Sequence, residues 1–247
     1  MPSQSSSSSS ANGLISPIRP VRITRGKSES VMVNEGCFVN LWNHLGGSVT
    51  LTETRRFYDI KANAYDEEMT ELNYKGPKVI FEKFRELRIS RGSRILDVGC
   101  GTGLLGVELK AAGFCQIHGI DMSSEMLRIN RKKGSYLSLG LTMVEPDTDL
   151  TSLRDFDVVC LLSSLRPGHI SPACLENLST CLTSGGYLIW ARSSDIPSGH
   201  FTDSFDEDTW SEVKGKLSTL GILCLEESFI ELFVRDKPGM IGVLRKM

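Results

Sequence analysis

Residues 94–103 of this 247-residue chain read Arg-Ile-Leu-Asp-Val-Gly-Cys-Gly-Thr-Gly. A short apolar run of this kind predicts a buried strand, and glycines at alternate positions directly after it let the backbone turn sharply. The residues that follow place Leu105 and Leu109 on one helical stripe, which ends at Gly113. The stretch therefore predicts a strand–loop–helix unit whose loop can approach a ligand closely.

Apolar runs of strand length alternate with segments of helical periodicity around this unit, which predicts stacked βα units and a parallel sheet. Strands are expected over 94–98, 116–120, part of 137–144, 156–162 and 187–191, with helices between them; one of these runs from Ser171-Pro172 to Gly185-Gly186. The last apolar runs, 222–234 and 240–244, are separated by a short polar turn and should pair antiparallel. We expect a single doubly wound α/β domain with a seven-stranded, mainly parallel sheet and an antiparallel last strand.

Residues 1–48 differ in composition from the rest of the chain. Ser5 to Ser10 form a homopolymer, and residues 1–28 hold four basic side chains and no acid. Such a segment buries too little apolar surface to offset its ordering entropy, so we predict a Ser-rich, largely disordered tail over 1–48 and one domain over 49–247. A Ser- and Arg-rich leader without acids also has transit-peptide composition, which leaves a mitochondrial location open beside the expected cytoplasmic one.

The net charge of −2 averages two unlike parts. Residues 1–28 carry +4, so residues 29–247 carry −6, and an acidic body is poorly suited to grip a nucleic acid backbone. No run approaches the roughly 18 apolar residues of a membrane span, and we expect a monomer that does not enter a membrane. The seven cysteines form no C-x-x-C pair, so neither a disulfide framework nor a metal site is expected.

Two carboxylates accompany the glycine loop. Asp121 ends the next expected strand, where it can accept two ribose hydroxyls, and Gly101 to Gly106 match the dinucleotide pattern G-x-G-x-x-G. A nicotinamide-dependent oxidoreductase is therefore one interpretation. Asp97 favours another, because a carboxylate inside the strand would repel a pyrophosphate. S-adenosylmethionine carries an ammonium and a sulfonium group and no phosphate, so an acidic pocket suits it.

At these residues the chain resembles the class I S-adenosylmethionine-dependent methyltransferases. Their first motif, acid-x-G-x-G-x-G, stands here as Asp97-Val-Gly-Cys-Gly-Thr-Gly103. Residues 57–66, Phe-Tyr-Asp-Ile-Lys-Ala-Asn-Ala-Tyr-Asp, resemble the helix that precedes this motif and folds over the cofactor, and residues 119–127, 156–159 and 182–186 resemble later motifs. The resemblance covers most of residues 50–247 and fits best the methyltransferase-like proteins of the Williams–Beuren syndrome region.

The resemblance implies a Rossmann-like methyltransferase fold with S-adenosylmethionine as cofactor. It assigns cofactor contacts to Tyr58, Tyr65, Asp97, Gly99, Cys100, Gly101, Gly103, Asp121 and Met122. Asp97 would hold the methionine ammonium, directly or through water, while Asp121 would bind the ribose diol beside Met122 at the adenine. Tyr58 and Tyr65 would close over the cofactor.

The segment after the third expected strand departs from the family pattern. Many relatives carry there an acid that binds the adenine amine, whereas this chain has Thr142-Met-Val-Glu-Pro146. Neither Met143 nor Glu145 is an assured equivalent of that acid.

The acceptor side is expected at the loop after the fourth strand, residues 163–170. His169 is the best-placed general base there and Arg166 could anchor an anionic substrate, although a surface-loop role for His169 stays open. We expect a methyltransferase that moves the methyl group to a small-molecule or protein acceptor by in-line displacement. Two alternatives remain: the nicotinamide-dependent oxidoreductase, and a cofactor-binding protein without transfer activity.

Overall fold

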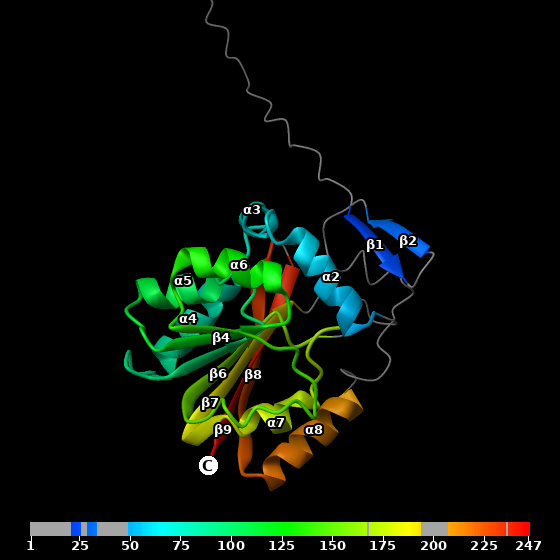
Figure 1. Cartoon of the computed structure of the whole chain (residues 1–247). Helices are drawn as coiled ribbons and strands as arrows, with labels where there is room; N and C mark the ends of the chain where they lie inside the picture. Colours follow the sequence, from blue (N-terminus) through cyan, green and yellow to red (C-terminus); the bar gives the residue numbers. More distant parts are fainter. Residues whose placement is uncertain (1–20, 26–28, 34–48, 167, 194–206, 236) are drawn as a thin grey trace, which may run out of the picture.

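A seven-stranded sheet forms the centre of the molecule, with the strand order β5-β4-β3-β6-β7-β9-β8 (Figure 1). The computed structural model describes residues 21–25, 29–33, 49–166, 168–193, 207–235 and 237–247. The strands of the sheet are β3 (Ile95–Val98), β4 (Ile117–Asp121), β5 (Ser138–Leu141), β6 (Phe156–Leu162), β7 (Leu182–Ser193), β8 (Ile222–Val234) and β9 (Lys237–Lys246). The helices are α2 (Leu51–Lys61), α3 (Tyr65–Glu71), α4 (Gly76–Glu86), α5 (Leu104–Ala111), α6 (Ser124–Lys133), α7 (Cys174–Ser179) and α8 (Glu207–Thr219).

The pairing of the strands confirms the predicted fold class. Strands β5, β4, β3, β6 and β7 are parallel to their neighbours, whereas β9 runs antiparallel to both β7 and β8. In the ladder, Asp97 of β3 lies opposite Gly119 of β4 and Cys160 of β6. The order reverses between β3 and β6, and a ligand site is expected at this reversal, beyond the carboxyl ends of the strands.

Two apolar clusters hold the helices against the two faces of the sheet. One cluster joins α4 and α5 to the strands through Phe84, Leu105 and Leu109. The other joins α7 and α8 through Leu175 and Leu217. Figure 1 shows α4, α5 and α6 on one side of the sheet and α7 and α8 on the other. Because both faces are covered, the central strands are almost continuously apolar, as their sequence indicates.

Local signals mark the ends of α6, whereas the expected extent of α7 differs from the structure. Ser123 caps α6 by accepting a hydrogen bond from the Met126 amide at 3.1 Å, and Gly134 ends this helix at φ +61°. The expected helix from residue 171 to the glycine pair was wrong in extent. Helix α7 covers only Cys174–Ser179, and β7 begins at Leu182 and runs through both glycines. The apolar stripe is nevertheless buried, because strand and helix residues there share one cluster.

The described part of the N-terminal tail is a pair of short strands. Strands β1 (Val21–Arg25) and β2 (Glu29–Val33) pair antiparallel, and β1 contacts α2. The expected disorder of residues 1–48 otherwise lies outside the described residues, as does the proposed leader. None of the helices in the described ranges is long and apolar enough to cross a membrane.

Two glycine substitutions test the packing of the antiparallel end of the sheet. A Cβ at Gly242 would lie 2.2 Å from Cε2 of the buried Trp190 ring, whereas a Cβ at Gly215 in α8 would meet nothing within 4 Å. Gly242→Ala is expected to lower the free energy of unfolding by about 1–3 kcal/mol through overpacking. Gly215→Ala should raise it by about 0.5–1 kcal/mol because alanine favours a helix interior. Urea unfolding of both variants measures this; equal effects would contradict the packing described.

Candidate functional site

The glycine loop between β3 and α5 makes two close approaches to other segments. Gly99 has φ +75°, and a Cβ there would lie 2.5 Å from Cβ of Ser164 in the loop after β6. Gly103 has φ +88°, and its Cβ would lie 2.6 Å from Oδ1 of Asn130 on α6. Both positions therefore need glycine for backbone conformation and for space.

A cleft opens beside this loop at the carboxyl ends of the central strands, about 660 Å³ when the open solvent at its entrance is included. It is lined by Leu51, Tyr58, Tyr65, Gly99, Gly101, Asp121, Met122, Met126, Thr142, Met143, Val144, Leu162, Ser163, Ser164, His169 and Ile170. Among these described side chains Asp121 is the one carboxylic acid, and no Lys or Arg is present. The cleft thus combines apolar and sulfur-containing walls with an acid, which suits a flat heterocycle and a sugar diol better than a phosphate.

Asp121 ties the end of β4 to the glycine loop. Its Oδ2 accepts a hydrogen bond from the Gly101 amide and its Oδ1 accepts one from the Ser123 amide, each at 2.8 Å. Burial raises the pKa of this carboxyl, and the two amide hydrogen bonds partly oppose that rise. The carboxylate is therefore fixed in orientation at the cleft wall.

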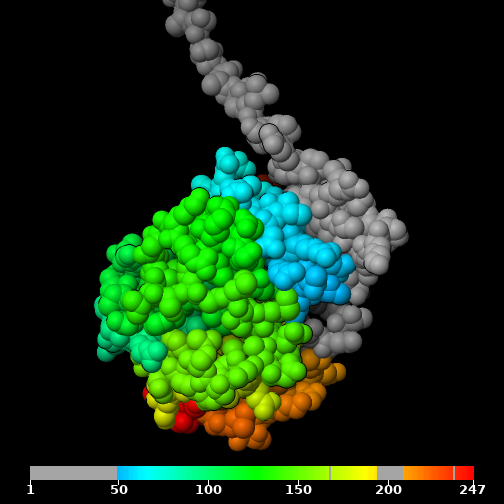
Figure 2. All heavy atoms as spheres, in the orientation of Figure 1, coloured from blue at the N-terminus to red at the C-terminus, as the bar shows by residue number. Residues whose placement is uncertain are grey.

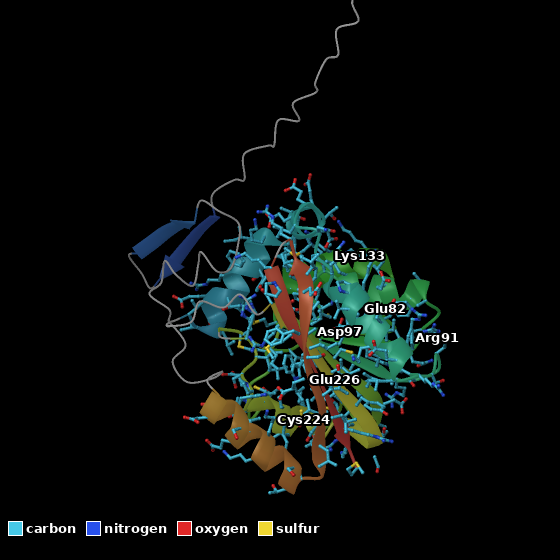
Figure 3. The ribbon with its side chains drawn as sticks, turned by 180° about the vertical axis from the view of Figure 1, so that it is seen from behind. Glu82, Arg91, Asp97, Lys133, Cys224 and Glu226 are labelled. Atoms are coloured by element: carbon cyan, nitrogen blue, oxygen red, sulfur yellow. The ribbon has the colours of Figure 1, made fainter. Side chains whose placement is uncertain are left out.

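Asp97 lies beneath the loop rather than on the wall of the cleft. Its residue is 1% exposed, and Figure 3 shows it among the strands at the centre of the molecule. Oδ2 accepts a hydrogen bond of 2.6 Å from the Tyr136 hydroxyl, whereas Oδ1 has no hydrogen-bond partner among the described residues. Burial raises the pKa of Asp97 to about 7, the Tyr136 hydrogen bond lowers it, and Asp121 raises it.

Helices α2 and α3 border the cleft through Tyr58 and Tyr65, and α2 packs against α6. In Figure 2 the cyan surface of these two helices lies directly beside the green surface of later elements. The expected single pre-motif helix is two helices joined by a turn before Tyr65. Asp66 accepts a hydrogen bond of 2.5 Å from Thr102 of the glycine loop and pairs with Lys133 of α6 at 2.5 Å. Thr54 of α2 donates to the Gly168 carbonyl oxygen at 2.6 Å. These contacts place Tyr58 and Tyr65 over the cleft.

The loop after β6 forms the other side of the cleft. The Tyr58 hydroxyl lies 2.9 Å from Nε2 of His169, and the two rings meet edge to face. Ser163 adopts φ +57°, and its Oγ lies 2.8 Å from the Tyr74 hydroxyl. A non-glycine residue held at positive φ beside a cleft is typical of functional loops.

The predicted site residues fall into three groups. Tyr58, Tyr65, Gly99, Gly101, Asp121 and Met122 line the cleft together with His169. Asp97, Cys100 and Gly103 lie below that surface as buried parts of the strand and loop. Arg166 is not a lining residue, but it lies near enough for its charge to lower the pKa of Tyr65, although burial raises that pKa to about 12 overall.

The segment after β5, residues 142–146, contributes part of the cleft wall. Thr142 and Met143 line the cleft, whereas Glu145 is exposed and is not a lining residue. Met143 thus lies in the cleft wall, in the segment where many relatives of the resembled family carry the acid that binds the adenine amine.

Two residues at the site carried no recognisable sequence signal. Tyr136 donates to Asp97 from the turn between α6 and β5. Asn130 of α6 donates through Nδ2 to the Gly101 carbonyl oxygen at 3.1 Å and so supports the loop. An asparagine inside a helix and a tyrosine after a helix-ending glycine are ordinary by themselves, and only tertiary contact gives them a role.

The cysteines and acids offer no metal centre in the described parts of the chain. No group of three or more metal-ligating side chains occurs there, and the six described cysteines are free thiols. Burial raises the pKa of Cys100 and Cys160 well above its usual range, which keeps both thiols protonated.

Comparisons with known proteins agree with this geometry. The chain matches a family model described as a methyltransferase domain over residues 89–226, more than half of its length. Human methyltransferase-like protein 27 is 29% identical over 150 residues, which cover 60% of this chain and 61% of that protein. The putative methyltransferase YqeM of Bacillus subtilis is 38% identical over 158 residues, which cover 60% and 62% of the two chains.

Two solved structures share the fold at low sequence identity. A TehB-like SAM-dependent methyltransferase from Corynebacterium glutamicum is similar with a TM-score of 0.55 at 18% identity, over 76% of this chain and 99% of that one. The [4+2]-cyclase SpnF is similar with a TM-score of 0.60 at 15% identity, over 81% and 97% of the chains.

Together, the fold, the glycine loop and its acids agree with the class I S-adenosylmethionine-dependent methyltransferases. The chain belongs to the methyltransferase domain family. The family match favours this class over the nicotinamide-dependent oxidoreductase that the glycine pattern had left open. The chain spans about three fifths of the length of the curated relatives described above.

The stability of the chain should depend on pH through Asp97. The folded pKa of about 7 lies above the unfolded value of about 3.9, so the folded state keeps a proton that the unfolded state releases. This group's contribution to the free energy of unfolding should fall as pH rises from about 4 and level off above about 7. Asp97→Asn removes the effect, so relative to it the native chain should lose about 2.5 kcal/mol between pH 5 and pH 8, because nearly two pH units of this range lie below the folded pKa.

Urea unfolding of both proteins at pH 5, 6, 7 and 8 measures this difference. A gap between them that stays constant with pH would contradict the buried, poorly compensated carboxyl.

Proposed function

We propose that this protein transfers the methyl group of S-adenosylmethionine to a small-molecule or protein acceptor. The observation that carries the proposal is the buried Asp97, with one oxygen unpartnered among the described residues, directly beneath a glycine loop at the mouth of a cleft without cations. An acid in that place favours a ligand with a cationic amino-acid group. The acidic body and the absence of lining Lys or Arg among the described residues argue against a nucleic acid acceptor.

Different residues around the cleft bind different parts of the cofactor. Asp97 serves the ammonium group, directly or through water, and the loop amides and Asp121 fix the ribose. Met122 and Met143 supply polarisable apolar surface for the adenine. Tyr58 and Tyr65 cover the cleft from α2 and α3 and exclude water from it.

When bound, S-adenosylmethionine supplies a methyl group already activated by a sulfonium, which an acceptor takes by in-line displacement. The protein's task is therefore mainly to hold the acceptor in line with that carbon. We place the acceptor against the loop after β6, beside Ser163 and His169. His169 takes the proton of an acceptor that arrives protonated, and the Tyr58 hydroxyl at 2.9 Å orients its ring.

Arg166 gives the acceptor side a positive charge. It lies near Arg192 at the end of β7: burial of Arg192 and, to a smaller extent, the charge of Arg166 lower the pKa of Arg192 to about 10. Arg166 and Arg192 would attract an anionic group of the acceptor, whereas Asp97 and Asp121 would attract the ammonium of the cofactor. The two charged groups would therefore bind at different places in the site. We assign Arg166 to the acceptor on this basis.

Cofactor binding is the first test of the proposed function. Isothermal titration calorimetry should show binding of S-adenosylhomocysteine and none of NAD. Asp121→Ala should weaken binding by about ten- to a hundredfold, because hydrogen bonds to a charged group contribute about 1.5–3 kcal/mol. Asp208→Ala, at an exposed residue of α8, is the matched control and should bind like the native chain. Binding of NAD alone would overturn the proposal.

Methyl transfer is the second test. Incubation of the protein with methyl-labelled S-adenosylmethionine and fractions of a cell extract should label an acceptor. His169→Gln should lower the rate about 10²–10⁴-fold, the usual contribution of a general base, while S-adenosylhomocysteine still binds. An unchanged rate would remove His169 from the chemistry. No labelled product despite proven cofactor binding would favour a binding protein without transfer activity.

A further inference from the structure

Tyr136 occupies a slot that two glycines leave open beneath the cofactor loop. A Cβ at Gly106 of α5 would lie 2.1 Å from Cε2 of the Tyr136 ring, and a Cβ at Gly119 of β4 would lie 2.9 Å from its Cδ1. The ring could not lie here if either position carried a side chain. Helix α5, strand β4 and the turn after α6 therefore combine to bring one hydroxyl to the end of β3.

The Tyr136 hydroxyl connects the start of α5 to Asp97. It accepts a hydrogen bond from the Gly106 amide at 3.0 Å and donates one to Oδ2 of Asp97 at 2.6 Å. Gly103, the N-cap residue of α5, has no side chain that could satisfy the first amides of the helix. Tyr136 thus replaces the missing cap. Through the Tyr136 hydroxyl, the partial positive charge at the N-terminus of α5 is linked by hydrogen bonds to the Asp97 carboxylate.

The hydrogen bond from the Gly106 amide to Tyr136 makes the N-terminus of α5 a poorer phosphate site. A free helix N-terminus behind a glycine loop commonly binds phosphate. Here one of its amides is already bonded to the phenol, and the adjacent group is an acid. The same residue that supports Asp97 therefore also weakens the site for a dinucleotide.

We propose that Tyr136 is a positioning residue that holds Asp97 through Oδ2 and leaves Oδ1 for the α-ammonium of the cofactor's amino-acid part. The proposal rests on the proposed function and adds a residue that selects a cationic amino-acid group over a phosphate. Tyr136 acts through Asp97, and its effect should be confined to ligands that carry the ammonium.

The charged and titratable groups around Asp97 support this role. Asp121 ends β4, Cys160 lies on β6 and Cys100 in the loop, and the Tyr74 hydroxyl lies in front of α4. Of these neighbours, Asp121 raises the pKa of Asp97, and burial raises it further. The Tyr136 hydrogen bond is the contact that lowers it. Without the phenol, Asp97 should hold its proton to a higher pH and bind a cation less well.

Tyr136→Phe tests the proposal with two ligands. S-adenosylhomocysteine carries the amino-acid part, whereas 5′-methylthioadenosine keeps the nucleoside and lacks the ammonium. The variant should bind S-adenosylhomocysteine about tenfold more weakly, the loss expected for one hydrogen bond to a charged group, and 5′-methylthioadenosine unchanged. Tyr187→Phe, at a half-buried tyrosine of β7 packed under Arg245, is the matched control and should bind both ligands like the native chain.

The pH dependence gives a second readout. Native affinity for S-adenosylhomocysteine should rise as pH increases through about 7, because Asp97 loses its proton, and in Tyr136→Phe the midpoint should move to higher pH. Equal weakening of both ligands would mean that Tyr136 is merely structural, and an unchanged midpoint would overturn the proposal as well. Failure of the native chain to bind S-adenosylhomocysteine would instead overturn the proposed function, so the two failures are distinguishable.

Discussion

The burial of one carboxylate in the middle of a parallel sheet constrains much of this structure. Asp97 sits between two strands at a point where water does not reach it, and a buried acid is costly unless it is hydrogen bonded or meets a cation. Among the described residues Tyr136 donates one hydrogen bond to this carboxyl, and the tyrosine ring fits because Gly106 and Gly119 have no side chains. The remaining oxygen is the part of the group that a ligand can satisfy.

The distribution of charge around the cleft follows from the same constraint. An acid beneath the loop, a second acid at the end of β4 and no described lining cation exclude the electrostatics of a phosphate site. Arg166 belongs to the loop after β6, near enough for its charge to lower the pKa of Tyr65. A site with this polarity matches the chemistry of a sulfonium cofactor and an electron-rich acceptor. The fold alone does not specify that chemistry, since a [4+2]-cyclase shares it.

Local patterns predicted the central unit well because the signals for it are contiguous. The strand, the glycines and the helix after them lie within one short stretch, and Ser123 and Gly134 bound α6 as their residue types indicate. The prediction was wrong where two signals competed. The pair Gly185-Gly186 is typical of a helix end, yet β7 begins before it. The two glycines form an irregular part of that strand, since β6 pairs with Leu182 and then only from Tyr187 onward, and Gly185 has φ +80°.

The sequence by itself determined the class of sheet, the glycine loop and the two acids, because each depends on residues close together in the chain. Only the tertiary structure decided which distant residues serve those acids. Tyr136, Asn130 and Tyr74 reach the site from turns and helices far along the chain, and none belongs to a local pattern. Their roles arise when packing brings their polar atoms to groups that water no longer solvates, and a one-dimensional pattern does not contain that information.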